Sequence, residues 1–441
     1  MNRRQDAPPV GRHGADTYCE GLLTGLLRHH DRVWWLDGSA GRPWSGRDSV
    51  LGWLTDDDPS LTYDASRREV TEHRGSTATV VGDDLFAVLR ERVTDGDRWV
   101  GWVGYAGRHD LPAHTGDGAP DACWMPMLRT VTVDHVTGDT RLHRLDPATL
   151  AGLLVDPGPA PPPEPVRVAS DWAAGPYDAA FARVQDALRA GHTYEVNLTY
   201  RHVLDGAAGA AAAWGAYRRL RRVNPAPYAG FVHHRGTSLL AASPERFARV
   251  ADGVVDTRPV KGTVARLADP ADDRRLARGL AADPRTRAEN LIVCDLLRND
   301  VATVSRPGTV RVPHLLAVET YPGLHQLVST VRGTLADGVT AVDVVRALLP
   351  GGSMTGAPKL RTLEVIAAVE DSARGVYSGA FGWLGRDAAD LGMVIRSWVH
   401  DGTRWTAGTG GGVTVLSDTD SEYAETRLKL ARLLAALGVA A

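Results

Sequence analysis

The stretch Thr257-Arg258-Pro259-Val260-Lys261-Gly262-Thr263 reads as a β-strand end that runs into a tight glycine turn, with a lysine at the turn. Lysine is rare in this chain. Of its 50 basic residues only Lys261, Lys359 and Lys429 are lysines, so 50 − 3 = 47 are arginines. Because arginine serves everywhere else, a retained lysine indicates a need for an amine, as a compact ammonium or as a nucleophile. Three ordinary surface lysines are the simpler alternative.

The composition of the 441-residue chain is typical of a globular protein with a real core, at 43% apolar and 23% charged residues. A net charge of −3 gives no electrostatic sign of a nucleic-acid or membrane surface. The chain has neither a secretory signal at its start nor an apolar run near the roughly 20 residues of a membrane span. Three widely separated cysteines form no disulfide framework or zinc site. We therefore expect a cytoplasmic protein without nucleic-acid or membrane partners.

Hydrophobic periodicity predicts an α+β chain built on antiparallel sheet. Residues 1–155 carry short strands with a few helices, and residues 156–165 form a stiff proline-rich linker to a larger part over residues 166–441. In that part, His192 to Leu204 alternates as a strand. Apolar stripes predict helices over residues 18–30, 85–93, 177–190, 211–223, 285–298, 340–349, 358–369 and 420–437.

Two of the predicted helices carry carboxylates. Glu422, Glu425 and Lys429 share one face at i, i+3 and i+7, and Glu289 lies on the helix expected over residues 285–298. Hard carboxylate oxygens are the ligands that Mg²⁺ takes from proteins, together with substrate oxygens. A solvated helix face, or a capping role for Glu289, is the alternative.

Two glycine-rich loops, Pro350–Lys359 and Ala407–Val413, look at first like nucleotide-binding motifs. The first lacks the Lys-Ser/Thr of a Walker A loop, and the second leads into another strand where a dinucleotide site requires a helix. Their backbone amides, with Arg396 nearby in sequence, suit a small anionic substrate. No Gly-x-Ser-x-Gly elbow or Cys-His-acid arrangement is recognisable, so the chain shows no glutaminase nucleophile of its own.

Taken together, these motifs resemble the chorismate-utilising enzymes, which include anthranilate synthase component I, aminodeoxychorismate synthase component I, isochorismate synthase and salicylate synthase. The fold that this resemblance implies is a large antiparallel β-sandwich flanked by helices. The matching segments, spread over about residues 170–435, are Tyr194–Thr199, Ser243–Phe247, Pro259–Thr263, Glu289–Asp300, Leu327–Thr330, Gly351–Lys359, Arg374–Gly379, Ile395–Arg396, Ala407–Gly412 and Glu422–Lys429.

The resemblance is closest to aminodeoxychorismate synthase component I, which has lysine at the place of Lys261 where the other subgroups usually have alanine. It implies that Lys261 attacks C2 of chorismate while the C4 hydroxyl leaves, protonated by Glu245, and that ammonia then adds at C4 and expels the lysine. A lysine with this role needs a depressed pKa. The implied site residues are Glu289, Glu422 and Glu425 for Mg²⁺ and Thr263, Tyr377, Arg396, Gly410, Gly411, Gly412 and Lys429 for the substrate.

The resemblance also implies a partner. Since no glutaminase nucleophile is evident, ammonia would come from a separate glutamine amidotransferase or from free ammonium. One alternative is an enzyme acting at C2 of chorismate, such as an aminodeoxyisochorismate, anthranilate or isochorismate synthase. Another is a chorismate-binding subunit that has lost turnover.

Three positions depart from the family pattern. Gln326 stands where histidine is usual, and the neighbouring His325 should face the other side of its strand. Glu195 stands where amine-adding members usually have glutamine and water-adding members lysine. Thr286 replaces a common acidic residue. The first two bear on proton transfer and on the choice between C4 and C2.

Overall fold

The structure is a computed structural model that describes residues 5–7, 14–39, 46–170, 174–206, 209–321 and 323–439. Its α-helices are α1 (Ala15–Leu26), α2 (Leu85–Arg92), α3 (Pro147–Leu153), α4 (Ala174–Arg189), α5 (Ala210–Val223), α6 (Pro270–Ala282), α7 (Pro284–Ala302), α8 (Ala341–Leu348), α9 (Lys359–Val369) and α10 (Thr419–Ala436). A short 3₁₀ turn, η1, covers Gly352–Met354. None of the described helices is long and apolar enough to cross a membrane.

The strands form two large sheets. The first has the order β1 (Gln5–Ala7), β10 (Thr140–His143), β9 (Arg129–Asp134), β3 (Asp48–Trp53), β2 (Arg32–Asp37), β13 (Tyr228–His234), β14 (Thr237–Ser243), β23 (Ser397–His400), β24 (Arg404–Val413), β12 (Glu195–Asp205) and β11 (Arg167–Ser170), and β20 (Gly356–Ala357) pairs with β12.

The second sheet has the order β17 (Val260–Ala265), β19 (Leu324–Thr334), β16 (Val254–Arg258), β15 (Arg246–Ala251), β22 (Ala389–Met393), β21 (Ala380–Gly385), β7 (Arg98–Val103), β8 (Ala122–Pro126), β4 (Ser60–Asp64), β5 (Glu69–Arg74) and β6 (Thr77–Gly82), and β18 (Arg311–Thr320) pairs with β19.

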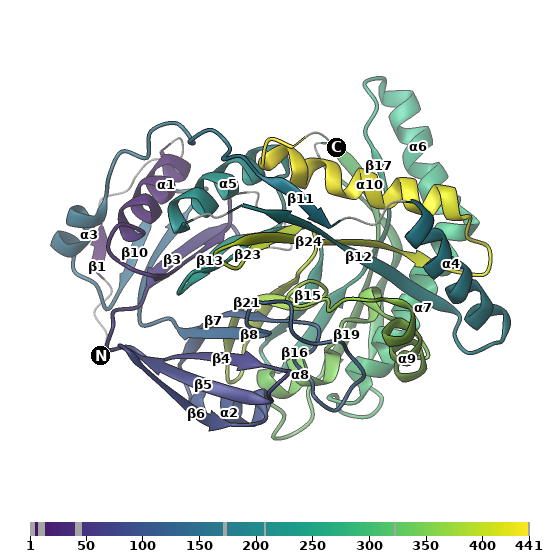
Figure 1. The fold of residues 1–441 in the computed structure, drawn as a ribbon, viewed down its shortest axis with the longest axis horizontal. Coiled ribbons are helices and arrows are strands. Elements are labelled where there is room, and N and C mark those ends of the chain that lie inside the picture. Colours follow the sequence, from purple (N-terminus) through teal and green to yellow (C-terminus); the bar gives the residue numbers. More distant parts are fainter. Residues whose placement is uncertain are drawn as a thin grey trace.

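The two sheets lie face to face as layers, and helices cover their outer sides (Figure 1). Helices α1, α5 and α10 pack on the first sheet, whereas α2, α7 and α8 pack on the second. Neighbouring strands run antiparallel. This arrangement confirms the predicted α+β sandwich with flanking helices.

Strands from both sides of the proline-rich linker are neighbours in both sheets. In the first sheet β2 pairs with β13, and in the second β7 pairs with β21. The linker itself has no helix or strand, and it lies along α5, where the Arg218 and Arg219 guanidinium groups donate hydrogen bonds to the carbonyls of Gly158 and Pro161. The residues before the linker therefore share the sandwich with those after it.

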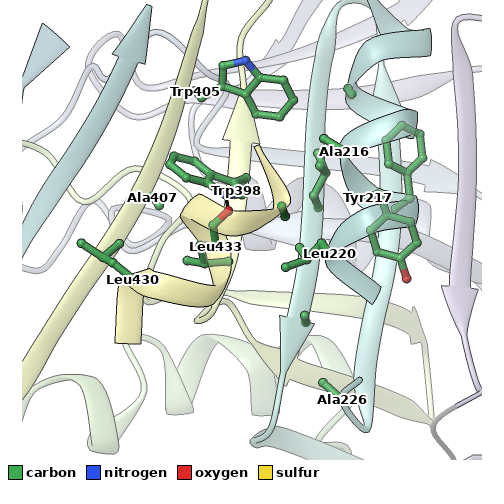
Figure 2. Packing of buried hydrophobic residues seen from close by; sticks show 14 of the residues in the cluster. Ala216, Tyr217, Leu220, Ala226, Trp398, Trp405, Ala407, Leu430 and Leu433 are labelled. Carbon is green, nitrogen blue, oxygen red and sulfur yellow. Dashed lines mark hydrogen bonds between the residues drawn. The ribbon is translucent and has the colours of Figure 1, made fainter. Parts of the chain in front are cut away.

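The outer layer of the first sheet is held by apolar packing between helix and strand. Leu430 and Leu433 of α10 lie beside Trp398 of β23 and Ala407 of β24 (Figure 2). The Trp398 indole N–H, which would be costly to bury unpaired, donates to the carbonyl oxygen of Leu433 at 2.9 Å. This contact fixes α10 across β23 and β24, and so sets the position of the carboxylates at the start of α10.

Alternation along β12 divides the apolar core from a polar interior. Val196, Leu198 and Tyr200 are fully buried in the core cluster that the helices cover. The positions between them, Glu195, Asn197, Thr199 and Arg201, point to the opposite face and are also buried. Elsewhere the space between the sheets is filled by apolar residues such as Trp34 and Trp102. Since buried polar groups are costly without partners, this polar row indicates a functional site.

Candidate active site

Lys261 lies at an irregularity of β17, next to the polar row. The register of β17 against β19 shifts between Val260 and Thr263, so Lys261 and Gly262 form a bulge. The sequence predicted a strand ending in a glycine turn, which is wrong, because β17 continues beyond the glycine. Gly262 has φ +83°, and a Cβ there would clash with Thr286 of α7. Bulges commonly re-aim side chains beside active sites, as this one does for Lys261.

The amine of Lys261 is held by carboxylates from other elements. Its Nζ donates to Oε1 of Glu195 at 2.6 Å, and the two side chains are 12% and 2% exposed. Burial alone would lower the pKa of Lys261, but Glu195, Glu289 and Glu245 together raise it above its usual value. The expected depression of this pKa is therefore wrong for the substrate-free protein, in which Lys261 is an ammonium ion.

Glu195 has one oxygen left over. While Oε1 accepts from Lys261, Oε2 is buried and has no hydrogen-bond partner among the described residues. A buried carboxylate oxygen without a donor is costly, so this atom is suited to a proton or a positively charged ligand. The sequence identified Glu195 only as a departure from the family pattern. Its contact with Lys261 joins residues 66 positions apart, and no local pattern could have shown it.

Glu245 has the character of an acid that is protonated near neutral pH. It is 5% exposed in the turn between β14 and β15, and burial raises its pKa to about 7. The Ser353 hydroxyl, from η1, donates to Oε1 of Glu245 at 2.6 Å. Glu245 also contributes to the raised pKa of Lys261, which places the two groups in one electrostatic environment.

The end of β24 offers unpaired backbone amides to the same region. β23 pairs with β24 only at Thr406 and Trp405. Lys429 Nζ donates to the carbonyl of Gly410 at 2.8 Å, so that carbonyl faces away from β12. In an antiparallel strand the N–H and C=O of one residue point the same way, so the amides of Gly410 and Gly412 face this free edge. A Cβ on Gly412 would lie 3.0 Å from Lys261 Nζ, so a larger residue would fill the site.

Gly411 faces α10 instead. A Cβ at Gly411 would lie 3.1 Å from Oε2 of Glu422 and 4.0 Å from Nζ of Lys429. The three glycines therefore let two different groups approach β24: the amine of Lys261 on one face and the side chains of α10 on the other.

Tyr377 lies at the other end of β24's glycine run, and Arg396 is close enough for its charge to act on Tyr377. The Arg396 guanidinium makes no hydrogen bond or ion pair with the described residues, and its backbone has φ +52°, a strained conformation for a non-glycine residue. Burial, and next the charge of Arg432, lower the pKa of Arg396. The buried Tyr377 ring lies against Gly408, where a Cβ would clash with it. An unpaired guanidinium beside a second cation is suited to bind an anion.

The predicted metal carboxylates come together around an arginine that the sequence did not identify. Arg285 Nε donates to Oε1 of Glu289 at 3.1 Å, and its Nη2 donates to Oε1 of Glu422. Glu425 also raises the pKa of Arg285, although its own ion pair is with Lys429 at 2.8 Å. The start of α10 and α7 lie on the same side of the molecule (Figure 1).

The carboxylate oxygens of Glu289 and Glu422 are suitable ligands for a divalent cation. Burial raises the pKa of both Glu289 and Glu422, so the pair gains from a nearby positive charge, and a guanidinium already lies between them. Across the described residues no group of three or more His, Cys, Asp or Glu side chains is arranged to hold a metal. Mg²⁺ at this place would therefore take few protein carboxylates and complete its shell with substrate oxygens and water.

The remaining predicted positions divide between this region and the scaffold. Thr263 is exposed beside the bulge, and its hydroxyl accepts a hydrogen bond from Gln326 at 3.4 Å. His325 faces the other way, as expected, and bonds Asp273 at 2.9 Å. Lys359 binds Asp300 at 2.6 Å, away from Lys261, and so ties the glycine-rich loop to α7.

Comparison with known proteins identifies the class. Residues 46–435 match the family model for chorismate binding enzymes, and this chain belongs to that family. The fold agrees with the crystal structure of anthranilate synthase component I from Streptococcus pneumoniae, with a TM-score of 0.72 at 24% identity over 89% of this chain and 93% of that one.

Two curated relatives of this chain share the name aminodeoxychorismate synthase. The chain is 37% identical to an aminodeoxychorismate synthase of Streptomyces pristinaespiralis, over 97% of this chain and 66% of that protein. It is 40% identical to aminodeoxychorismate synthase component 1 of Salmonella typhimurium, over 62% of this chain and 61% of that protein. The chain thus spans less than two thirds of the length of either relative.

Proposed function

We propose that this protein converts chorismate and ammonia to 4-amino-4-deoxychorismate. The observation that carries the proposal is the position of Lys261, whose amine lies in a buried ring of carboxylates beside the glycine amides of β24. The family and the names of its relatives point to the same reaction. A lysine at this place gives a covalent route to C4, which a C2-directed enzyme does not need.

Chorismate is a small dianion, and the site residues can bind its two carboxylates at separate places. Arg396, with no partner in the described protein, would receive one of them together with the amides of Gly410 and Gly412, and Tyr377 would pack against it. Lys429, already bonded to the Gly410 carbonyl, adds a positive charge at this edge. Thr263 would line the entrance beside the bulge.

Mg²⁺, held by Glu289 and Glu422 with Glu425 nearby, would anchor the ring carboxylate and draw electron density from the ring. Burial raises the pKa of Glu289 and of Glu422, so a nearby positive charge would stabilise both carboxylates, and this supports the role. The chain's own residues supply the rest of the chemistry.

Proton transfer must precede attack, because the resting Lys261 is an ammonium ion. Glu195 is the nearest acceptor for that proton, at 2.6 Å. The free amine then forms a bond to C2, both ring double bonds shift, and the C4 hydroxyl leaves as water with a proton from Glu245. Ammonia next forms a bond to C4, both double bonds shift back, and Lys261 leaves C2 as the amine. Two allylic displacements place the nitrogen at C4 with retention of configuration.

The source of ammonia in this proposal is a glutamine amidotransferase on a separate chain, or free ammonium. The name "component 1" of the Salmonella relative supports a second component. Two positions support the alternative of a C2 product: Glu195 stands where amine-adding members usually have glutamine, and Gln326 stands where the family usually has histidine. Lys261 argues against that alternative.

The test is incubation of the purified protein with chorismate, Mg²⁺ and ammonium, with the product identified by mass spectrometry and NMR. Nitrogen at C4 supports the proposal, whereas anthranilate or another C2 product refutes it. In a second experiment without ammonia, intact-protein mass spectrometry should find a chorismate adduct that Lys261→Ala abolishes. Persistence of the adduct in that variant removes Lys261 from the mechanism.

A further inference from the structure

Arg285 is placed to act as a cation between the carboxylates assigned to the metal. It lies in the first turn of α7, one turn before Glu289, and it reaches across to Glu422 in the first turn of α10. Its Nε and Nη2 donate to Oε1 of each glutamate, and Nη2 also lies 3.5 Å from the Ser417 hydroxyl. One guanidinium thus joins α7 to α10 through residues that lie 137 positions apart in the chain.

Arg285 is more exposed to solvent than the two carboxylates that it joins. Glu422 is 2% exposed and Glu289 is 16% exposed, whereas Arg285 is 40% exposed. The carboxylates are therefore part of the interior, but the guanidinium approaches them from the solvent side on a long flexible stem. Arg285 can leave toward water without unpacking either helix, and the carboxylates cannot.

We propose that Arg285 is an internal counter-cation that neutralises Glu289 and Glu422 in the metal-free protein and is displaced when Mg²⁺ binds. The inference rests on the metal site of the proposed function. Arg285 already donates to both carboxylates that would hold a metal ion, so the two cations would compete for the same pair of negative charges. Without either cation, Lys261 would remain to lower the pKa of Glu289 and Lys429 that of Glu422, but neither of these lysines serves both carboxylates.

If Arg285 were a permanent structural ion pair, its removal would change metal affinity in the opposite direction. If Arg285 only joined α7 to α10, its loss would loosen both carboxylates and weaken metal binding. If Arg285 competes with the metal, its loss removes a competitor and strengthens metal binding, while the metal-free protein becomes less stable. The coupling between two mutually exclusive ligands acts equally on both.

The test is a calorimetric titration of the full chain with MgCl₂ in the absence of chorismate. Arg285→Ala should lower the Kd for Mg²⁺ about tenfold, a common size for coupling between two ligands. Arg285→Lys keeps the charge but not the forked guanidinium that reaches both carboxylates, so its Kd for Mg²⁺ should lie between those of Arg285→Ala and the wild type.

Arg287→Ala is the matched control. Arg287 is exposed on the same helix and bonds the Ala281 carbonyl, so its loss removes the same charge from α7 without freeing either carboxylate. Its Kd for Mg²⁺ should stay within about twofold of the wild type, because solvent and salt screen exposed charges.

A thermal-shift measurement completes the test. Without Mg²⁺, Arg285→Ala should melt below the wild type, and saturating Mg²⁺ should close the gap. An unchanged or higher Kd in Arg285→Ala overturns the inference, as does an equal fall in Arg287→Ala or a wild type that binds no Mg²⁺. None of these measurements involves chorismate, so they leave the identity of the product to be decided separately.

Discussion

Replacing Glu195 with glutamine should shift the pH at which Lys261 becomes reactive. Glu195→Gln keeps the size of the side chain and its hydrogen-bonding oxygen, but removes the negative charge that lies 2.6 Å from Lys261 Nζ. Both partners are buried, so solvent screens the pair little. With charge centres about 4 Å apart and an effective dielectric of about 20, the interaction is roughly 4 kcal/mol. At 1.36 kcal/mol per pKa unit, the loss lowers the pKa of Lys261 by about 3 units.

The assay should follow the rate of adduct formation between Lys261 and chorismate as a function of pH, without ammonia. Intact-protein mass spectrometry under single-turnover conditions measures this rate and is independent of the titration of ammonia itself. In the wild type, Lys261 stays protonated through the accessible alkaline range, because Glu195, Glu289 and Glu245 raise its pKa. Glu245 must be protonated to act as the general acid, and its pKa is about 7, so the rate should be level above about pH 7. That level region should extend through the alkaline range in the wild type, whereas in Glu195→Gln the rate should fall at its alkaline end, where Lys261 has already lost its proton.

Glu364→Gln serves as the control, since Glu364 forms an exposed ion pair with Arg361 on α9. Its profile should match the wild type. A Glu195→Gln profile that stays level as far into the alkaline range as the wild-type profile would refute the electrostatic argument, because it would mean that Glu195 does not control the charge of Lys261.

Three further predictions concern acid catalysis and stability. Glu245→Gln should slow adduct formation by about 10²–10⁴-fold, the usual contribution of general acid catalysis, while isothermal titration finds chorismate affinity nearly unchanged. Burial lowers the pKa of His233 to about 4, so this side chain is protonated more readily in the unfolded protein. Its contribution to stability is therefore constant above about pH 6.5 and falls by about 2 kcal/mol by pH 5, and urea unfolding of His233→Asn at both pH values should show a smaller difference than the wild type does. Glu370→Ala should lower the free energy of unfolding in urea by about 3–5 kcal/mol, because it leaves the buried Arg201 and Arg374 without their shared carboxylate. An acid dependence unchanged in His233→Asn, or a loss under about 1 kcal/mol in Glu370→Ala, would contradict the assigned causes.

Much of the local structure could be predicted from residue patterns. The apolar stripe over residues 420–437 predicted α10, which covers Thr419–Ala436, and the alternation from His192 predicted β12. Helix α6 was missed, because its buried residues are few and its exposed face is highly charged. The bulge at Lys261 was missed because it depends on how β17 pairs with β19, a strand about 65 residues later in the chain.

For the site, too, the sequence could predict the residues but not the contacts between distant parts of the chain. The motif resemblance located Lys261, Glu245, Glu289 and Glu422 as residues of one site, and the structure brings their charges together. Residue identities could not show that the amine of Lys261 is held as an ammonium ion, which reversed the expected direction of its pKa shift.

Most of the elements, their apolar faces and the residue types available for chemistry could be predicted from the sequence. These properties follow from periodicity and from side chains close together in the chain. The pairing of Lys261 with Glu195 and the place of Arg285 between two glutamates became visible only in the folded chain. The physical reason is that charge state depends on distance and burial, and strand pairing and helix packing set both between residues far apart in the chain.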